Sequence, residues 1–521
     1  MIKSQKISHA AFYLVIIGIV STFLGFLREL FLAYKFGVSA TTDSFLVAIV
    51  PISLLVYFAK SADVTFVSRF SKGLIKDGKK AWLSASRIIN VTIIFVAGLA
   101  LAFLFFAPFL TKLLAPGFSP DNLNLVSSLI RITVPAILTI PLFIFIKGIL
   151  NSHKHFTWPE IAALFPNLGV IFGILVLSAT LGIKGAVIGL VIGYILQALI
   201  PGIKILPFFF KNYSFSVSTK DPEVRKFFLY SFFLILILIG LNIDTVADKI
   251  FGSYLPIGSI AALNYARRIT ASAYYLIAYA LATTLLPVLS QANAIGDEKK
   301  FKEHFKIGLE MLIFILLPLS ILIFILREPI LIVLFKHGVF GSHDLSLTSS
   351  VLAIYSLGII ALAGITFLAR VFYSLDDIKI PAIIGIFTMV INVILDFILI
   401  KYFSFKGLAL ATLIAANLNF IALLIYLWLR SKAFKMKSLL IFLFKTLVAL
   451  TFVLVIIFSI FPYLKSIQTN EFLKSIIEII VISGLEVTIF LIVSYILKIE
   501  PLFHLKDFLY NLIGKINETR N

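Results

Sequence analysis

The sequence predicts an all-α polytopic membrane protein with about 14 transmembrane helices. Three observations predict this class: 60% of the 521 residues are hydrophobic, only 13% are charged, and the mean hydropathy is +1.08. A water-soluble fold could not cover so much apolar surface with so few charges. Because a hydrocarbon core about 30 Å thick needs about 20 residues per helix, fourteen helices account for most of the hydrophobic residues.

Hydrophobic runs between polar breaks place the expected spans along the chain, with boundaries good to about four residues. They are 10–35, 42–70, 81–112, 122–151, 157–182, 185–210, 224–251, 257–291, 302–326, 345–375, 380–402, 407–430, 438–461 and 472–497.

The distribution of Lys and Arg orients these spans. A net charge of +20 is also common in nucleic-acid-binding proteins, but here the basic residues gather in alternate loops. With the N-terminus inside, inner segments carry more than twice as many Lys and Arg residues as outer ones, which agrees with the positive-inside rule. We therefore expect both termini in the cytoplasm, a retained first span and no nucleic-acid partner.

An internal repeat divides the chain. An even number of spans separates the copies, so they should be related by a pseudo-two-fold axis along the membrane normal. We predict an N-terminal lobe at 1–215, a second lobe at 216–432, and two additional helices with a short cytoplasmic tail at 433–521. Matched positions, 221 or 222 residues apart, are Asp43-Ser44 with Asn264-Tyr265, 59–67 with 280–288, Gly117 with Gly338, Phe118 with Phe340, Pro159 with Pro381, and Lys184-Gly185-Ala186 with Lys406-Gly407-Leu408.

Motifs of soluble enzymes are absent from the sequence. The lack of cysteine excludes thiol catalysis and cysteine-ligated metal sites. The segment 73–80 approaches a phosphate-binding loop, but Lys80 stands where that motif needs Ser or Thr, and no strand precedes it. We therefore expect a transporter driven by gradients or membrane potential, and not an enzyme.

Charged side chains inside the spans are the candidate functional residues, because each costs about 2.5 to 3.5 kcal/mol at a helix centre. In the expected topology Arg28 and Arg268 both occupy the outer to middle part of the bilayer and can line one cavity. A guanidinium fork binds diphosphate or carboxylate oxygens bidentately. For Arg28 the alternatives are snorkelling to the interface and pairing with a carboxylate. The full set is Arg28, Glu29, Lys60, Asp63, Arg131, Lys147, Asp244, Asp248, Arg267, Arg268, Arg370 and Asp396.

A second group of polar residues has the chemistry of a cation site. Asp244 and Asp248 are four residues apart in the seventh span, and Asn392 and Asp396 repeat that spacing in the eleventh, so each pair shares a helix face. Thr412 adds a hydroxyl from the next span. Such oxygens suit a hard cation such as Na⁺. Inter-helix hydrogen bonding or pairing with Lys or Arg is the open alternative.

Seven short motifs resemble those of the MurJ (MviN) lipid II flippases and follow that family's order through the first twelve spans. They are VSTFLGFLRE (20–29), FG (36–37), TDSF (42–45), APGF (115–118), YARR (265–268), LPVLS (286–290) and FYSLDDIKIP (372–381). The resemblance implies the multidrug/oligosaccharidyl-lipid/polysaccharide exporter fold, with two six-helix lobes around a cationic cavity. It also implies a groove for the undecaprenyl tail at the last two helices, and residence in a bacterial inner membrane.

The resemblance also assigns roles to individual residues. Arg28 and Arg268 match two cavity arginines, Asp43 matches the acidic residue of the second span, and Glu29 matches a usual Asp. Some positions depart from the pattern: Thr22 stands where many members have arginine, Leu55 or its neighbour replaces the cavity arginine of the second span, and Arg267 replaces a common Asp or small residue. Lys60 is the candidate to supply the missing charge. The family's sodium site falls on Asp248, Asn392, Asp396, the backbone carbonyl of Leu408, and Thr412.

The expected function is therefore a flippase that moves lipid II, the undecaprenyl-diphosphate-linked peptidoglycan precursor, from the inner to the outer leaflet by alternating access. We expect a monomer in contact with membrane lipids, without a cofactor other than a sodium ion. Alternatives are a flippase for another undecaprenyl-diphosphate-linked glycan such as an O-antigen or capsule unit, a cation-coupled drug antiporter, and a scaffold or membrane enzyme. The expected substrate-binding residues are Arg28, Glu29, Asp43, Lys60, Arg267 and Arg268.

Overall fold

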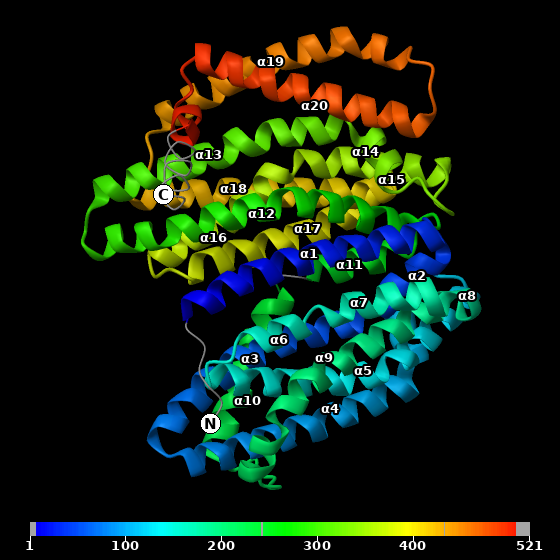
Figure 1. The fold of residues 1–521 in the computed structure, drawn as a ribbon, viewed down its shortest axis with the longest axis vertical. Helices are drawn as coiled ribbons and strands as arrows, with labels where there is room; N and C mark the ends of the chain where they lie inside the picture. The colour runs from blue at the N-terminus through cyan, green and yellow to red at the C-terminus, as the bar shows by residue number, and fades with distance from the viewer. Residues whose placement is uncertain (1–6, 241–242, 432, 507–521) are drawn as a thin grey trace, which may run out of the picture. The chain divides into compact units, whose positions relative to one another are not determined.

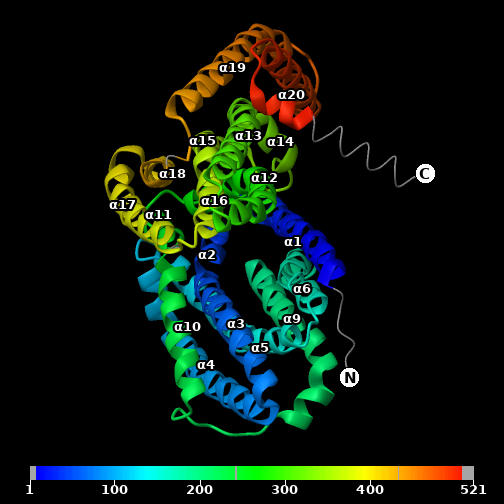
Figure 2. The same ribbon diagram turned by 90° about the vertical axis from the view of Figure 1, so that its left-hand side faces the viewer.

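A computed structural model gives the fold of the chain (Figures 1 and 2). It describes residues 7–240, 243–431 and 433–506, and every regular element in these ranges is a helix. Within them, 12 helical stretches are long and apolar enough to cross a membrane, or 13 if the bent pair at 342–374 forms one span. The predicted all-α membrane fold is confirmed, whereas the count of 14 spans is not.

The chain forms two compact units. Unit 1 comprises Met1–Ala262 with Gly338–Gly341, and unit 2 comprises Leu263–His337 with Ser342–Asn521. The lobe boundaries expected at 215 and 432 follow the sequence repeat and stay a prediction. The helices that begin in unit 1 are α1 (Ile7–Phe36), α2 (Ala40–Ala48), α3 (Val50–Lys76), α4 (Gly78–Leu114), α5 (Pro120–Ser152), α6 (Thr157–Ala162), α7 (Phe165–Phe172), the π-helix η1 (Gly173–Leu177), α8 (Ser178–Leu181), α9 (Ile183–Asn212), α10 (Pro222–Gly240), α11 (Ile243–Gly252) and α12 (Ser259–Ala294).

Unit 2 contains most of α12, from Leu263 onward, and all the later helices. Its last two, α19 and α20, pack on each other, and α20 also packs on α14. The predicted tenth span is bent by 46° between α15 and α16. The helices are α13 (Glu298–Ile325), α14 (Arg327–Leu334), α15 (Ser342–Leu357), α16 (Ile359–Ser374), α17 (Lys379–Phe403), α18 (Phe405–Ser431), α19 (Met436–Lys465) and α20 (Glu471–Ile496).

The local backbone recurs at the spacing of the sequence repeat. Gly182 ends α8 with φ 56° and ψ −141°, and Ser404, at the matching position, ends α17 with φ 52° and ψ −137°. Three residues further on, a Cβ atom on Gly185 or Gly407 would come within 2.7 Å of the backbone of the preceding helical segment. Each turn therefore folds the next helix tightly back, and the Lys-Gly match in the sequence marks this shared turn.

Glycines let two helical segments of unit 1 pack backbone against backbone. α9 carries Gly185, Gly189 and Gly193 at four-residue spacing, and the α7–η1 segment carries Gly169 and Gly173. A Cβ on Gly189 would lie 2.1 Å from the Gly169 carbonyl oxygen, and one on Gly169 would lie 2.2 Å from the Gly189 carbonyl oxygen. Small residues at this spacing allow close helix packing in a membrane. This contact fixes the broken fifth span against α9.

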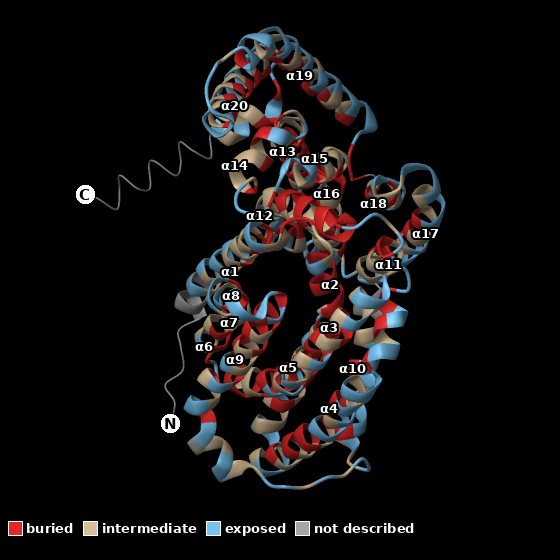
Figure 3. Cartoon of the chain, turned by 90° about the vertical axis from the view of Figure 1, so that its right-hand side faces the viewer, coloured by how far each residue is buried: buried red, intermediate tan, exposed pale blue. Residues whose placement is uncertain are grey.

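The outer faces of the helices remain apolar, as a lipid environment requires. Buried residues lie on the faces where helices meet, and exposed residues lie on the outer faces of the helices (Figure 3). Many of the exposed residues have large apolar side chains. On α4, for example, Phe105 is 71% exposed and Phe109 is 65% exposed. Such exposed aromatic groups would be unfavourable in water and are accommodated by acyl chains.

Replacing Gly189 with alanine is expected to lower the melting temperature of the purified protein by several degrees, because the new methyl group meets the Gly169 carbonyl oxygen and overpacking costs about 1–3 kcal/mol. Gly98→Ala is the matched control, since no atom lies within 4 Å of a Cβ at that position of α4. Equal melting temperatures for Gly189→Ala and the parent would contradict the proposed backbone contact.

Candidate functional site

In unit 1, the guanidinium of Arg28 on α1 is held between two acceptors. Its Nη2 and Nε donate to Glu29 Oε1 at 2.5 and 3.2 Å, and its Nη1 donates to Asn167 Oδ1 on α7 at 3.2 Å. The Glu29 side chain is 2% exposed and the Arg28 side chain 25%. These bonds use three of the five N–H groups of a guanidinium. One N–H on each terminal nitrogen is left for a ligand oxygen.

The Glu29 carboxylate fixes the orientation of Arg28 and offsets its charge. The structure thus bears out the pairing with a carboxylate that the sequence offered as one alternative for Arg28. A carboxylate repels an anionic ligand, so the geometry supports a positioning role for Glu29 and a binding role for Arg28. Asn167 was missed at the sequence level, because a single neutral amide in an apolar span carries no signal of its partner.

Asp43 on α2 caps the N-terminus of α12. Its Oδ2 accepts the Gly258 N–H at 2.6 Å, and its Oδ1 accepts the Ala261 N–H at 2.8 Å. Asp43 is buried, and Gly258 adopts φ +89° with Val38 pressed against it, a position that only glycine fits. The geometry supports a structural role for Asp43, because both carboxylate oxygens serve the first turn of α12.

Two lysines of unit 1 have different surroundings. Lys60 on α3 is exposed, and its Nζ lies 5.7 Å from the centroid of the Tyr57 ring. Lys147 on α5 instead lies 2.8 Å from Glu160 Oε1 and 3.8 Å from Asp63 Oδ2. Lys147 is therefore an ion-pairing residue within the bundle, whereas Lys60 is accessible to an anionic ligand.

In unit 2, Arg267 and Arg268 follow each other on α12, so their side chains diverge by about 100° around the helix. The Arg267 Nη2 donates to the Tyr355 hydroxyl at 3.5 Å, and its Cζ lies 5.7 Å from the Tyr355 ring centroid. Arg267 thus rests against α15 by a hydrogen bond and a cation–π contact. Arg268 is half-buried. Arg28 and Arg268 belong to different units, and a cavity shared by both stays a prediction.

The predicted cation ligands of unit 2 lie on α17 and α18, which pack together. Asn392 and Asp396 are 3% and 0% exposed. Neither polar atom of the Asn392 amide has a hydrogen-bond partner among the described residues. The Thr412 hydroxyl donates to the Leu408 carbonyl at 3.1 Å and so keeps its oxygen lone pairs for another contact.

A buried amide without a partner costs about 1–3 kcal/mol, and an ion ligated by its oxygen would remove part of this cost. The residues present therefore fit a sodium ion. Within the described ranges no three His, Cys, Asp or Glu side chains gather as a metal site, so a sodium ion held here would take most of its ligands from amide, hydroxyl and backbone oxygens, and the site itself stays a prediction. Asp248 on α11 is buried but belongs to unit 1, and its participation stays a prediction, as does that of Asp244.

Comparison with protein families gives one match over most of the chain. The sequence model described as "Lipid II flippase MurJ" matches residues 32–482. A protein of Buchnera aphidicola subsp. Acyrthosiphon pisum named "Probable lipid II flippase MurJ" is 29% identical over 479 residues, which cover 88% of this chain and 91% of that protein. The "Lipid II flippase MurJ" of Burkholderia cenocepacia is 26% identical over 80% of this chain and 82% of its own length.

Solved structures give the same fold. A structure of the lipid II flippase MurJ in an inward closed conformation aligns with a TM-score of 0.79 at 28% identity and covers 93% of this chain and 98% of that one. An inward-facing multidrug resistance MATE family transporter of the MOP superfamily aligns with a TM-score of 0.68 over 79% of this chain and 95% of its own. At 14% identity the second likeness shows the fold alone.

Asp43→Ala is expected to destabilise the protein by about 3 kcal/mol or more, because it removes two hydrogen bonds to a charged acceptor, each worth about 1.5–3 kcal/mol. Asp43→Asn keeps one acceptor oxygen and should lose less. Thermal unfolding of the purified variants measures both, with Asp121→Ala as control, since Asp121 is exposed at the start of α5. A melting temperature of Asp43→Ala equal to that of the parent would remove the capping role.

Proposed function

The chain belongs to the MurJ family of lipid II flippases, and from this premise we propose that it moves lipid II from the inner to the outer leaflet by alternating access. The match to the family model and the fold shared with a MurJ structure support this function. They favour lipid II over another undecaprenyl-diphosphate-linked glycan, because the named relatives are lipid II flippases. A flippase moves its substrate without changing its bonds, so the residues act by binding.

The observation that carries the mechanism is the guanidinium of Arg28, held by Glu29 and Asn167 with N–H groups left over. A diphosphate presents oxygens that two such N–H groups bind side by side. Because the fork is already oriented by the buried Glu29, little side-chain freedom is lost on binding. In our proposal Arg28 binds the diphosphate of lipid II, Arg268 supplies a second guanidinium, and Lys60 adds a mobile charge.

The tail and the topology complete the proposal. The undecaprenyl chain is apolar and stays among lipid tails or against apolar helix faces, while the head group crosses. We place both termini in the cytoplasm on the basis of the Lys and Arg distribution, and the chain works as a monomer.

We further propose that Na⁺ binds at α17 and α18 through Asn392, Asp396, Thr412 and the Leu408 carbonyl, and that its binding helps to reset the transporter.

Arg28→Ala is expected to abolish growth rescue in a bacterium whose own lipid II flippase is shut off, while the parent restores growth. Truncating one partner of a buried charge pair costs about 2–5 kcal/mol, a loss of about thirtyfold or more in affinity. Arg28→Lys should rescue poorly, since an ammonium group cannot copy the fork. Arg225→Ala is the control, because Arg225 is exposed near the start of α10 and is not among the candidate residues. Full rescue by Arg28→Ala at equal membrane abundance would refute the binding role.

Asp396→Asn is expected to remove most of the rise in melting temperature that Na⁺ gives the purified parent, because it replaces the charged oxygen ligand with an amide. Titration of NaCl against KCl at constant ionic strength separates binding from general salt effects. Asp121→Asn, at an exposed position of α5, should keep the full Na⁺ response. An unchanged response in Asp396→Asn would exclude this carboxylate as a ligand.

A further inference from the structure

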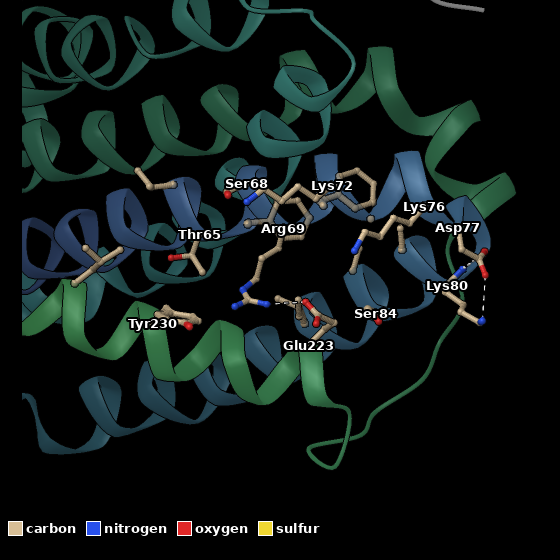
Figure 4. Close-up of a pocket in the computed structure, with 18 residues that line it drawn as sticks. Thr65, Ser68, Arg69, Lys72, Lys76, Asp77, Lys80, Ser84, Glu223 and Tyr230 are labelled. Carbon is tan, nitrogen blue, oxygen red and sulfur yellow. Dashed lines mark hydrogen bonds and ion pairs between the residues drawn. The ribbon is translucent and has the colours of Figure 1, made fainter. Parts of the chain in front are cut away.

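A groove between α3, α4 and α10 in unit 1 has a basic end and an apolar end. The basic end is a cavity of about 680 Å³ lined by Arg69, Lys72, Lys76 and Lys80 among others (Figure 4). A second cavity of about 320 Å³, lined by apolar side chains, lies between the same three helices. The two cavities are neighbours along α10, where Leu234 lines the basic one and Ile235 the apolar one.

The carboxylates that line the basic end pair with Arg69 and Lys80 rather than with Lys72 and Lys76. Arg69 Nη1 contacts Glu223 Oε2 at 2.7 Å, and Lys80 Nζ lies 3.3 Å from Asp77 Oδ2. Lys72 and Lys76 are exposed, stand one turn apart on the same face of α3, and have no ion-pair partner within the part of unit 1 that the structure describes. The cavity therefore keeps a surplus of positive charge at these two residues.

A third carboxylate near the cavity, that of Asp221, is also paired with other side chains. Asp221 Oδ2 accepts hydrogen bonds from Arg87 Nη1 at 2.8 Å and from the Ser84 hydroxyl at 3.2 Å. Burial raises the pKa of Asp221, but the hydrogen bonds from Arg87, the Glu223 N–H and Ser84 outweigh it and hold this pKa below its usual range. Asp221 is thus an ionised partner of Arg87 and does not offset the two lysines.

The groove is long enough to hold a phospholipid. Lys76 at the basic end and Phe58 at the apolar end are 18 residues apart on α3, about 27 Å along the helix axis. One leaflet with its head groups is about 20–23 Å thick. Val64 lies between them, lines the basic cavity and is 65% exposed, so an exposed apolar side chain stands at the edge of the basic cavity on the way to the apolar one.

We propose that this groove binds an anionic phospholipid, with its phosphate at Lys72 and Lys76 and an acyl chain lying past Val64 toward Phe58. Lysine ammonium groups bind phosphate as point charges, and basic pockets between membrane helices bind lipid head groups. The segment 73–80, whose sequence approaches a phosphate-binding loop, lies here. Its backbone is nearly all helical, so side chains rather than a loop of N–H groups hold the phosphate. This inference is independent of the proposed function.

The test is the melting temperature of the purified full chain in a neutral detergent, titrated with dioleoylphosphatidylglycerol, dioleoylphosphatidylcholine or inorganic phosphate. The parent should show a saturable rise with phosphatidylglycerol alone. Lys72→Gln/Lys76→Gln should need at least tenfold more of this lipid for the same rise. Lys299→Gln/Lys300→Gln is the matched control, since these lysines are exposed at the start of α13 and do not line the groove.

A second variant tests the apolar half. Val64→Trp fills the groove without changing its charge, so it should also weaken the phosphatidylglycerol effect. Three results would overturn the proposal: no response of the parent to phosphatidylglycerol, an equal response to inorganic phosphate, which would assign the site to a free anion, or equal losses in the two double-lysine variants, which would show general charge attraction only. Folding is checked for each variant by its melting temperature in detergent alone.

Discussion

The placement of charged side chains among apolar helices is the constraint on which this structure depends. Each such group is costly in a membrane unless a partner is supplied. Lys147 meets Glu160 and Asp63, and Arg28 meets Glu29 and Asn167. Lys147 is thus engaged in holding helices together, whereas Arg28 keeps N–H donors for a ligand.

Arg28 combines both roles. Its bonds to Glu29 and Asn167 hold the guanidinium in one orientation between α1 and α7, yet leave an N–H on each terminal nitrogen. α7 in turn is held against α9 by close glycine contacts, so the position of the Asn167 acceptor rests on backbone packing. A bound diphosphate would then meet a donor pair that is already placed, and this pre-organisation reduces the entropy lost on binding.

The sequence was informative where local pattern decides structure. Hydrophobic runs predicted the helices, and the Lys-Gly repeat marked turns that prove to share one backbone conformation at Gly182 and Ser404. It was less informative where distant residues meet. The capping of α12 by Asp43 joins residues more than 200 positions apart, and neither periodicity nor composition encodes such a contact. The predicted seventh span covers α10, α11 and the two residues between them. Those two residues, 241–242, lie outside the described ranges.

The most direct test of the account is lipid II translocation by the purified chain in sealed vesicles, measured as the fraction of fluorescent lipid II that becomes accessible to an external enzyme. The account predicts that vesicles with the parent expose the lipid much faster than protein-free vesicles, and that vesicles with folded Arg28→Ala behave like the protein-free ones. Equal rates for the parent and the empty vesicles, under an imposed Na⁺ gradient and membrane potential, would contradict the flippase function. Equal rates for the parent and Arg28→Ala would contradict the role of the oriented arginine.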